Sequence, residues 1–154
     1  MEGSSGVSRL RVNCLVLALL VDLFVAGAQA KPPVQVKRVR VSSYHGYARV
    51  VVDLDGSVIY RIRRLTAPER LYVDLVSTTI APPLKSGRIP VNVARLKQIR
   101  VGNNQGAVTR LALDLRSEVT LKAFQLSRPP RLVLDLKPPT AARAIAREIG
   151  RAHV

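Results

Sequence analysis

The side chains of this sequence best suited to binding chemistry are basic or tyrosyl, and several alternate with apolar residues in short segments. Planar guanidinium groups bind carboxylates and phosphates through two parallel hydrogen bonds. Tyrosine rings offer flat faces on which a sugar can stack. We therefore expect these residues to bind an anionic or sugar-containing ligand. The candidate binding residues are Arg40, Arg61, Arg63, Arg100, Lys122, Tyr44 and Tyr47.

Both groups of candidates also have a purely structural interpretation. The arginines could keep the molecules soluble through mutual electrostatic repulsion. Tyr44, His45 and Tyr47 flank Gly46 in a predicted hairpin loop, where the rings could close one end of the core instead of contacting a ligand.

Residues suited to catalysis are scarce. The sequence holds two histidines, His45 and His153, and one cysteine, Cys14. It contains no H-E-x-x-H, G-x-S-x-G or G-x-x-x-x-G-K-[ST] motif. Because a catalytic zinc ion usually has three protein ligands, we expect no metal, no other cofactor and no enzymatic activity from this chain on its own.

The charge balance indicates the class of partner. Lysine and arginine number 25 against 10 aspartates and glutamates, which gives a formal net charge of +15. Such a charge favours polyanions: nucleic acid, anionic lipid or an acidic cell-wall polymer.

Residues 1–30 have the pattern of a secretory signal peptide. Two arginines precede the apolar run CLVLALLVDLFVAGA, which is followed by the small-residue cleavage pattern that ends at Ala30. The run is shorter than the roughly 20 residues of a transmembrane helix and includes Asp22. We predict cleavage after Ala30 and export to the periplasm or cell envelope, where nucleic acid is not an expected partner. An uncleaved membrane anchor is the alternative.

The segments that must position the candidate residues form an internal repeat. Four segments recur in the same order, and each alternates apolar and polar residues with the period of a half-buried strand. The repeat units span 37–75 and 97–136. The aligned segments are KRVRV (37–41) with KQIRV (97–101), ARVVVDL (48–54) with TRLALDL (109–115), SVIYRI (57–62) with EVTLKA (118–123), and PERLYVDL (68–75) with PPRLVLDL (129–136).

Each half is therefore predicted to be a four-stranded, mostly antiparallel meander with one apolar face. Two such sheets, packed about 10 Å apart, give an all-β sandwich of two pseudosymmetric four-stranded sheets. Asp55-Gly56 predicts a tight turn between the second and third strands. Residues 76–95 contain Pro82-Pro83 and Pro90, and we expect them to cross between the sheets with one short helix or extra strand near 91–95.

Arginine and aspartate share the outer side of four predicted strands. Neighbouring strands could set them opposite one another as ladders of ion pairs, each worth about 0–1 kcal/mol when exposed. The residues that share one strand are Arg49 with Asp53, Arg70 with Asp74, Arg110 with Asp114, and Arg131 with Asp135.

The pattern RVVVDLDGSVIYRIRRLTAPERLYVDL, with the repeated ending PPRLVLDL, resembles the amidase N-terminal domain, AMIN, over residues 36–137. That family is found ahead of bacterial N-acetylmuramoyl-L-alanine amidases and of type IV pilus secretins. The resemblance implies a pair of symmetric four-stranded sheets that bind peptidoglycan and direct their protein to the cell wall, often at the division site. It also implies a division or pilus assembly protein as a further partner.

In the amidases of that family a zinc-dependent catalytic domain follows, and this sequence has no counterpart for its ligands. Residues 138–154 indicate a basic linker or the start of a helix. Three hypotheses remain: a peptidoglycan-binding module of an amidase, the equivalent module of a secretin or another periplasmic assembly, and a basic nucleic-acid-binding protein. The signal peptide and the alternation of arginine with aspartate count against the third.

Overall fold

The computed structural model describes residues 31–140 apart from 83, 85–86 and 94, so the predicted signal peptide and residues 141–154 lie outside it. Within the described residues the chain forms ten strands and no helix. The strands are β1 (Val34–Tyr44), β2 (Tyr47–Leu54), β3 (Ile59–Thr66), β4 (Glu69–Val76), β5 (Thr78–Ile80), β6 (Gly87–Val93), β7 (Leu96–Asn104), β8 (Val108–Leu115), β9 (Thr120–Ser127) and β10 (Pro130–Lys137). No helix in this part of the chain is long and apolar enough to cross a membrane.

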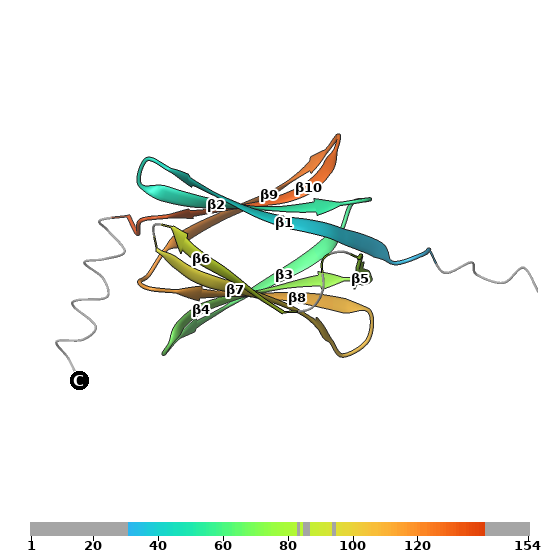
Figure 1. The fold of residues 1–154 in the computed structure, drawn as a ribbon, viewed down its shortest axis with the longest axis horizontal. Coiled ribbons are helices and arrows are strands. Elements are labelled where there is room, and N and C mark those ends of the chain that lie inside the picture. Colours follow the sequence, from blue (N-terminus) through green and yellow to red (C-terminus); the bar gives the residue numbers. More distant parts are fainter. Residues whose placement is uncertain (1–30, 83, 85–86, 94, 141–154) are drawn as a thin grey trace, which may run out of the picture. The chain divides into compact units, whose positions relative to one another are not determined.

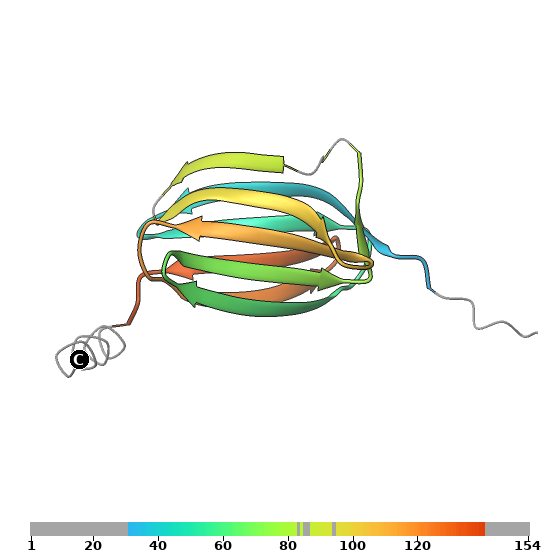
Figure 2. The same ribbon diagram turned by 90° about the horizontal axis from the view of Figure 1, so that it is seen from below.

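The strands form two sheets that pack face to face (Figures 1 and 2). The first sheet has the order β5-β1-β2-β10-β9, and the second has the order β3-β4-β8-β7-β6. Each sheet contains four long strands from the repeat and one edge strand from the connection between the repeats. The predicted all-β sandwich with two pseudosymmetric sheets is thus confirmed.

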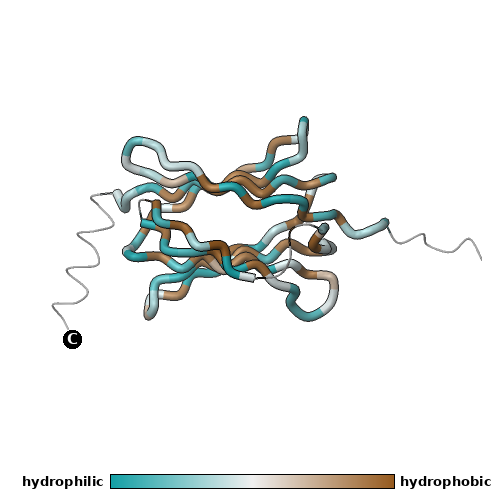
Figure 3. Tube along the Cα trace, viewed as in Figure 1, coloured by the Kyte–Doolittle hydropathy of each residue, from teal (hydrophilic) through white to brown (hydrophobic). Residues whose placement is uncertain are grey.

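The core follows from the alternation along the strands, which is visible as alternating polar and apolar residues (Figure 3). Leu71, Leu111, Leu113, Leu132 and Leu134 are at most 1% exposed, and the intervening residues of their strands lie on the outside of the sandwich. Burying one leucine side chain contributes about 1.5–3 kcal/mol. The inner faces of both sheets therefore hold the sandwich together, and their outer faces remain for other uses.

The predicted hairpins β1–β2, β3–β4, β7–β8 and β9–β10 are present, but the predicted pairing of the second strand of each half with the third is wrong, because each sheet combines two strands from each repeat. β2 pairs with β10, and β4 pairs with β8. Asp55-Gly56 consequently lies where the chain crosses from the first sheet to the second, not in a hairpin. The carboxylate of Asp55 accepts a hydrogen bond from the backbone N–H of Gln35 (2.8 Å). The Gln125 side chain bonds both the N–H and the carbonyl of Val58 (3.1 and 2.8 Å), so side chains satisfy the backbone at this crossing.

The pseudosymmetry survives this exchange of strands. Arg131 lies opposite Asp53 in the first sheet, and the repeat-related Arg70 lies opposite Asp114 in the second. Two hairpins also match, because Gly46 closes β1–β2 and Gly106 closes β7–β8 with φ angles of 80° and 70°. Side chains disfavour this left-handed conformation, which explains glycine at both turns.

The connection between the repeats contributes an extra strand to each sheet. In β5, the extra strand of the first sheet, the Thr78 hydroxyl bonds to the second sheet. It donates to the Leu75 carbonyl in β4 (2.8 Å) and accepts from the Thr109 N–H in β8 (3.1 Å). β6 contains Pro90 and pairs only with β7, with a register shift after the proline. Proline fits such an edge strand because the strand has a free side. The extra strand predicted near 91–95 therefore exists but spans 87–93, and the alternative of a short helix is wrong.

Candidate functional site

The candidate residues lie on the two outer faces of the sandwich, which we call the first face and the second face after their sheets. Strand register places the outward side chains in matching rows. The first face includes Arg38, Arg40, Ser42, Tyr44, Tyr47, Arg49, Val51, Asp53, Lys122, Phe124, Leu126, Arg131, Val133 and Asp135. The second face includes Arg61, Arg63, Leu65, Arg70, Tyr72, Asp74, Gln98, Arg100, Gly102, Asn104, Val108, Arg110, Ala112 and Asp114.

Two aspartates organise the arginines of the first face. Arg40 donates two hydrogen bonds to Asp53 (2.7 and 2.9 Å), and Arg131 lies 3.2 Å from the same carboxylate. Arg49 donates two hydrogen bonds to Asp135 (2.6 and 2.9 Å). Paired contacts of this kind fix the plane of the guanidinium group as well as its position.

The second face repeats the arrangement around Asp74 and Asp114. Arg110 donates two hydrogen bonds to Asp74 (2.6 and 2.8 Å), and Arg63 approaches the same carboxylate to 3.2 Å. Asp114 accepts hydrogen bonds from Arg100 (3.1 and 3.2 Å). The remaining donors to Asp114 are Arg70 and Gln98.

These contacts lower the pKa of Asp74, Asp114 and Asp135. Hydrogen bonds from Arg110 and Arg49 lower the pKa of Asp74 and Asp135, respectively. Desolvation by burial acts to raise the pKa of Asp114, but hydrogen bonds from Gln98, Arg100 and Arg70 outweigh it, so that this pKa is also lowered. Since three of the four aspartates each contact two arginines, the carboxylates orient the guanidinium groups without cancelling their charge.

An aromatic cluster sits at one end of the first face. The rings of Tyr44 and Tyr47 stack with centroids 5.1 Å apart and planes at 12°. The guanidinium carbon of Arg49 lies 5.4 Å from the Tyr44 centroid and 5.9 Å from the Phe124 centroid. Cation–π contacts at exposed sites contribute about 0.5–1 kcal/mol. The tyrosines thus pack on the outside of the sheet and leave Tyr44 47% exposed.

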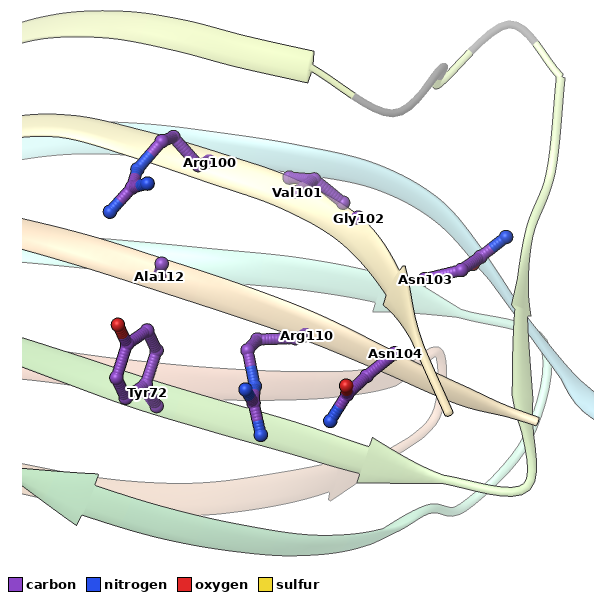
Figure 4. A pocket seen from close by; sticks show the side chains of 8 residues that line it. All are labelled: Tyr72, Arg100, Val101, Gly102, Asn103, Asn104, Arg110 and Ala112. Atoms are coloured by element: carbon purple, nitrogen blue, oxygen red, sulfur yellow. The ribbon is translucent and has the colours of Figure 1, made fainter. Parts of the chain in front are cut away.

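The second face is hollowed over its central strands. A hollow of about 320 Å³ lies over β4, β7 and β8 (Figure 4). Its floor is low because Gly102 and Ala112 have little or no side chain. A neighbouring hollow of about 550 Å³ is lined by Arg61 and Arg63, among others, and shares Asn104 and Arg110 with the first.

The seven predicted binding residues do not form one cluster. The first face carries Arg40, Lys122, Tyr44 and Tyr47, and the second carries Arg61, Arg63 and Arg100. Lys122 lies with its ammonium group 5.9 Å from the Phe124 centroid. All seven point outward, yet a small ligand could contact only those on one face.

Sequence reasoning missed Tyr72 and Ala112, which shape the hollow, and assigned Arg110 only to an ion pair. A signal was present in the repeat. The repeat places Val133 at the position equivalent to Tyr72, and Val51 at the position equivalent to Ala112. Outward positions where the two repeats carry different residues are the ones that can give the two faces different ligands.

The arrangement is suited to binding. Within residues 31–140, gaps excepted, no group of three histidines, cysteines, aspartates or glutamates is placed to hold a metal ion. Arginines, tyrosines and an asparagine on the sheets instead offer hydrogen-bond donors and flat rings to a ligand that lies across the strands.

Comparison with known proteins agrees with this architecture. The model of the AMIN domain family matches residues 38–136, and the chain belongs to that family. It is 31% identical over 113 residues to the N-acetylmuramoyl-L-alanine amidase AmiC of Escherichia coli O6:H1 and 30% identical over 107 residues to AmiC of Neisseria meningitidis serogroup B. These matches cover 70% and 64% of the chain but only 27% and 25% of the amidases, so the chain spans about a quarter of the length of these relatives.

Proposed function

We propose that this chain is a non-catalytic module that binds peptidoglycan and directs an N-acetylmuramoyl-L-alanine amidase to it in the cell envelope. Membership of the AMIN family supports the proposal, as does the similarity to two amidases. The amidase relatives favour this context over a secretin. Export through the predicted signal peptide at residues 1–30 is part of the proposal.

The observation that carries the proposal is the arrangement of aspartate-oriented arginines on two opposite faces. Each face holds a pair of aspartates with a surplus of basic groups around them. Stem peptides of peptidoglycan present carboxylates at repeated intervals, which guanidinium groups bind well. A single exposed ion pair is weak, so affinity would come from many contacts along the polymer.

Sedimentation with purified peptidoglycan tests the proposal. The parent chain should sediment with the polymer, lose retention as salt is raised, and release no stem peptide even with added zinc. The triple variant Arg40→Ser, Arg61→Ser and Arg63→Ser should be retained about tenfold less, because three lost contacts of about 0.5 kcal/mol each add up to about 1.5 kcal/mol.

The matched control removes the same charge away from the two faces. Arg95 and Arg116 bond Ser117 and Asn92 near strand ends, and Arg128 lies in the β9–β10 turn. Replacement of these three by serine should leave most of the retention. Equal loss in both triple variants would mean that net charge alone causes binding, and an absence of sedimentation in the parent would refute the proposal.

A further inference from the structure

We propose that the hollow over β4, β7 and β8 on the second face is a subsite for a carboxylate carried by an N-acetylated sugar–peptide unit, and that the first face has no equivalent subsite. This inference rests on the proposed function, since such units make up peptidoglycan. It assigns the ligand to one face and to named residues.

The shape of the hollow follows from strand register. Across the sheet, Arg100 lies opposite Ala112, and Ala112 lies opposite Tyr72. In the next outward row Gly102 lies opposite Arg110. The two small residues are therefore diagonal neighbours, and taller side chains stand around them (Figure 4). At about 320 Å³ the hollow is at the lower end of the range for small-ligand sites, large enough for one substituted sugar ring.

The charge at the rim matches a carboxylate. Arg100 uses Nε and Nη2 to hold Asp114, and Arg110 uses the same two atoms to hold Asp74. The Nη1 group of each arginine has no hydrogen-bond partner among the described residues. Both guanidinium planes are thus fixed by an aspartate while a donor remains on each. Donors held in place lose little conformational freedom when an anion binds.

Two further groups suit the uncharged part of the ligand. The Tyr72 hydroxyl accepts a hydrogen bond from Arg70 (3.2 Å), which fixes the ring at the border of the hollow. The side chain of Asn104 lines the same hollow and can both donate to and accept from an acetamido group. The guanidinium group of Arg110 already lies over the Tyr72 ring, 5.0 Å from its centroid. The Tyr72 hydroxyl and the Asn104 amide are therefore the groups that, beside a carboxylate site, favour an acylated sugar over a simple anion.

The first face lacks this combination because the equivalent positions are filled. Val51 and Val133 stand where the second face has Ala112 and Tyr72. Ser42 replaces Gly102 opposite the arginine of the next row, and Tyr44 replaces Asn104. The arginines are repeated there, but neither the low floor nor the central ring is.

The test titrates the full chain with muramyl dipeptide, which joins an N-acetylated sugar to a peptide with one free carboxylate, and follows backbone amide shifts by NMR. We expect the shifts to cluster at Arg100, Tyr72 and Ala112. N-acetylglucosamine lacks the carboxylate and L-alanyl-D-isoglutamine lacks the ring, so each should bind at least about tenfold more weakly.

Two matched variants separate the faces. Ala112→Val fills the hollow with the residue that the first face already accommodates, keeps every charge, and should weaken muramyl dipeptide binding about tenfold or more. Val51→Ala, the reverse change on the first face, should leave binding unchanged. Arg100→Gln should abolish the preference for the carboxylate-bearing ligand over N-acetylglucosamine.

The outcomes distinguish this inference from the proposed function. Shifts confined to the first face, or equal weakening by Ala112→Val and Val51→Ala, would overturn the subsite. The subsite is also overturned if muramyl dipeptide does not bind while the chain still sediments with peptidoglycan, and the proposed function would then stand. Binding at the hollow without sedimentation would support the subsite and refute the polymer-binding role.

Discussion

The two outer faces carry the same aspartate framework but differ in what stands between the arginines. On the first face Val51 and Val133 fill the central row, and aromatic rings gather at one end around Arg49. On the second face the central row holds Ala112 and Tyr72, and a hollow opens beside them. The duplication thus preserved the groups that orient the arginines, while the intervening positions diverged.

The shared framework should be equally sensitive to damage in both sheets. Leu71 and Leu132 occupy equivalent inward positions and are 1% and 0% exposed. Replacement of either by alanine should lower the free energy of unfolding by about 2–5 kcal/mol, through lost burial and the cavity left behind. Chemical denaturation monitored by circular dichroism measures this. A difference of several kcal/mol between the variants would break the equivalence of the two sheets.

Acid should affect the second face more than the first. The pKa values of Asp74 and Asp114 on the second face, and of Asp135 on the first, are lowered in the folded state. The unfolded chain therefore takes up protons first as pH falls. The stability from these groups is complete above the ordinary aspartate pKa of about 3.9 and is lost as pH drops toward the lower folded values.

Replacement of aspartate by asparagine tests this difference. Asp114→Asn should cost about 1–3 kcal/mol at neutral pH, because its arginine and glutamine donors lose a charged acceptor. The double variant Asp74→Asn and Asp114→Asn should flatten the acid limb of a stability–pH curve more than Asp135→Asn does. An unchanged acid limb would show that other groups cause the acid sensitivity.

The smallest effect on ligand binding is expected when the two central residues of the first face are replaced by those of the second face. Val51→Ala combined with Val133→Tyr should create weak muramyl dipeptide binding there, within about tenfold of the native hollow. Shifts of the amides near Arg40, the counterpart of Arg100, would report it. Failure to gain binding in a folded variant would mean that Gly102 or Asn104 is also required.

Which residues lie inside and outside was predictable from the sequence, as were the hairpins within each half, but the pairing of one hairpin with another was not. The alternation in ARVVVDL identifies Val50 and Val52 as inward, and both are fully buried. Pairing of β2 with β3 or with β10 would bury them equally, so the pattern cannot choose between these partners. Asp55-Gly56 favours a local turn, but the long-range pairing of β2 with β10 prevailed.

The candidate site was predictable in chemical type but not in position. Outward arginines and tyrosines follow from the period of the strands, whereas their division between two faces depends on which strands join each sheet. Tyr72 and Ala112 escaped notice because the sequence presents one as an ordinary strand residue and the other as a small apolar one. Only the register with Arg100 makes them the sides and floor of one hollow.

The exchange of strands between the halves has a consequence for how the chain assembles. Arg49 and Asp135 stand 86 residues apart in the sequence and yet are opposite one another in the first sheet. Such high contact order slows folding. During synthesis from the N-terminus, the first sheet cannot close until β10 (Pro130–Lys137) has also been made. An approximate two-fold axis relates the two repeats, as an exact one would relate two half-length chains in a symmetric homodimer. The chain therefore resembles an interlocked dimer whose two subunits are joined in one polypeptide.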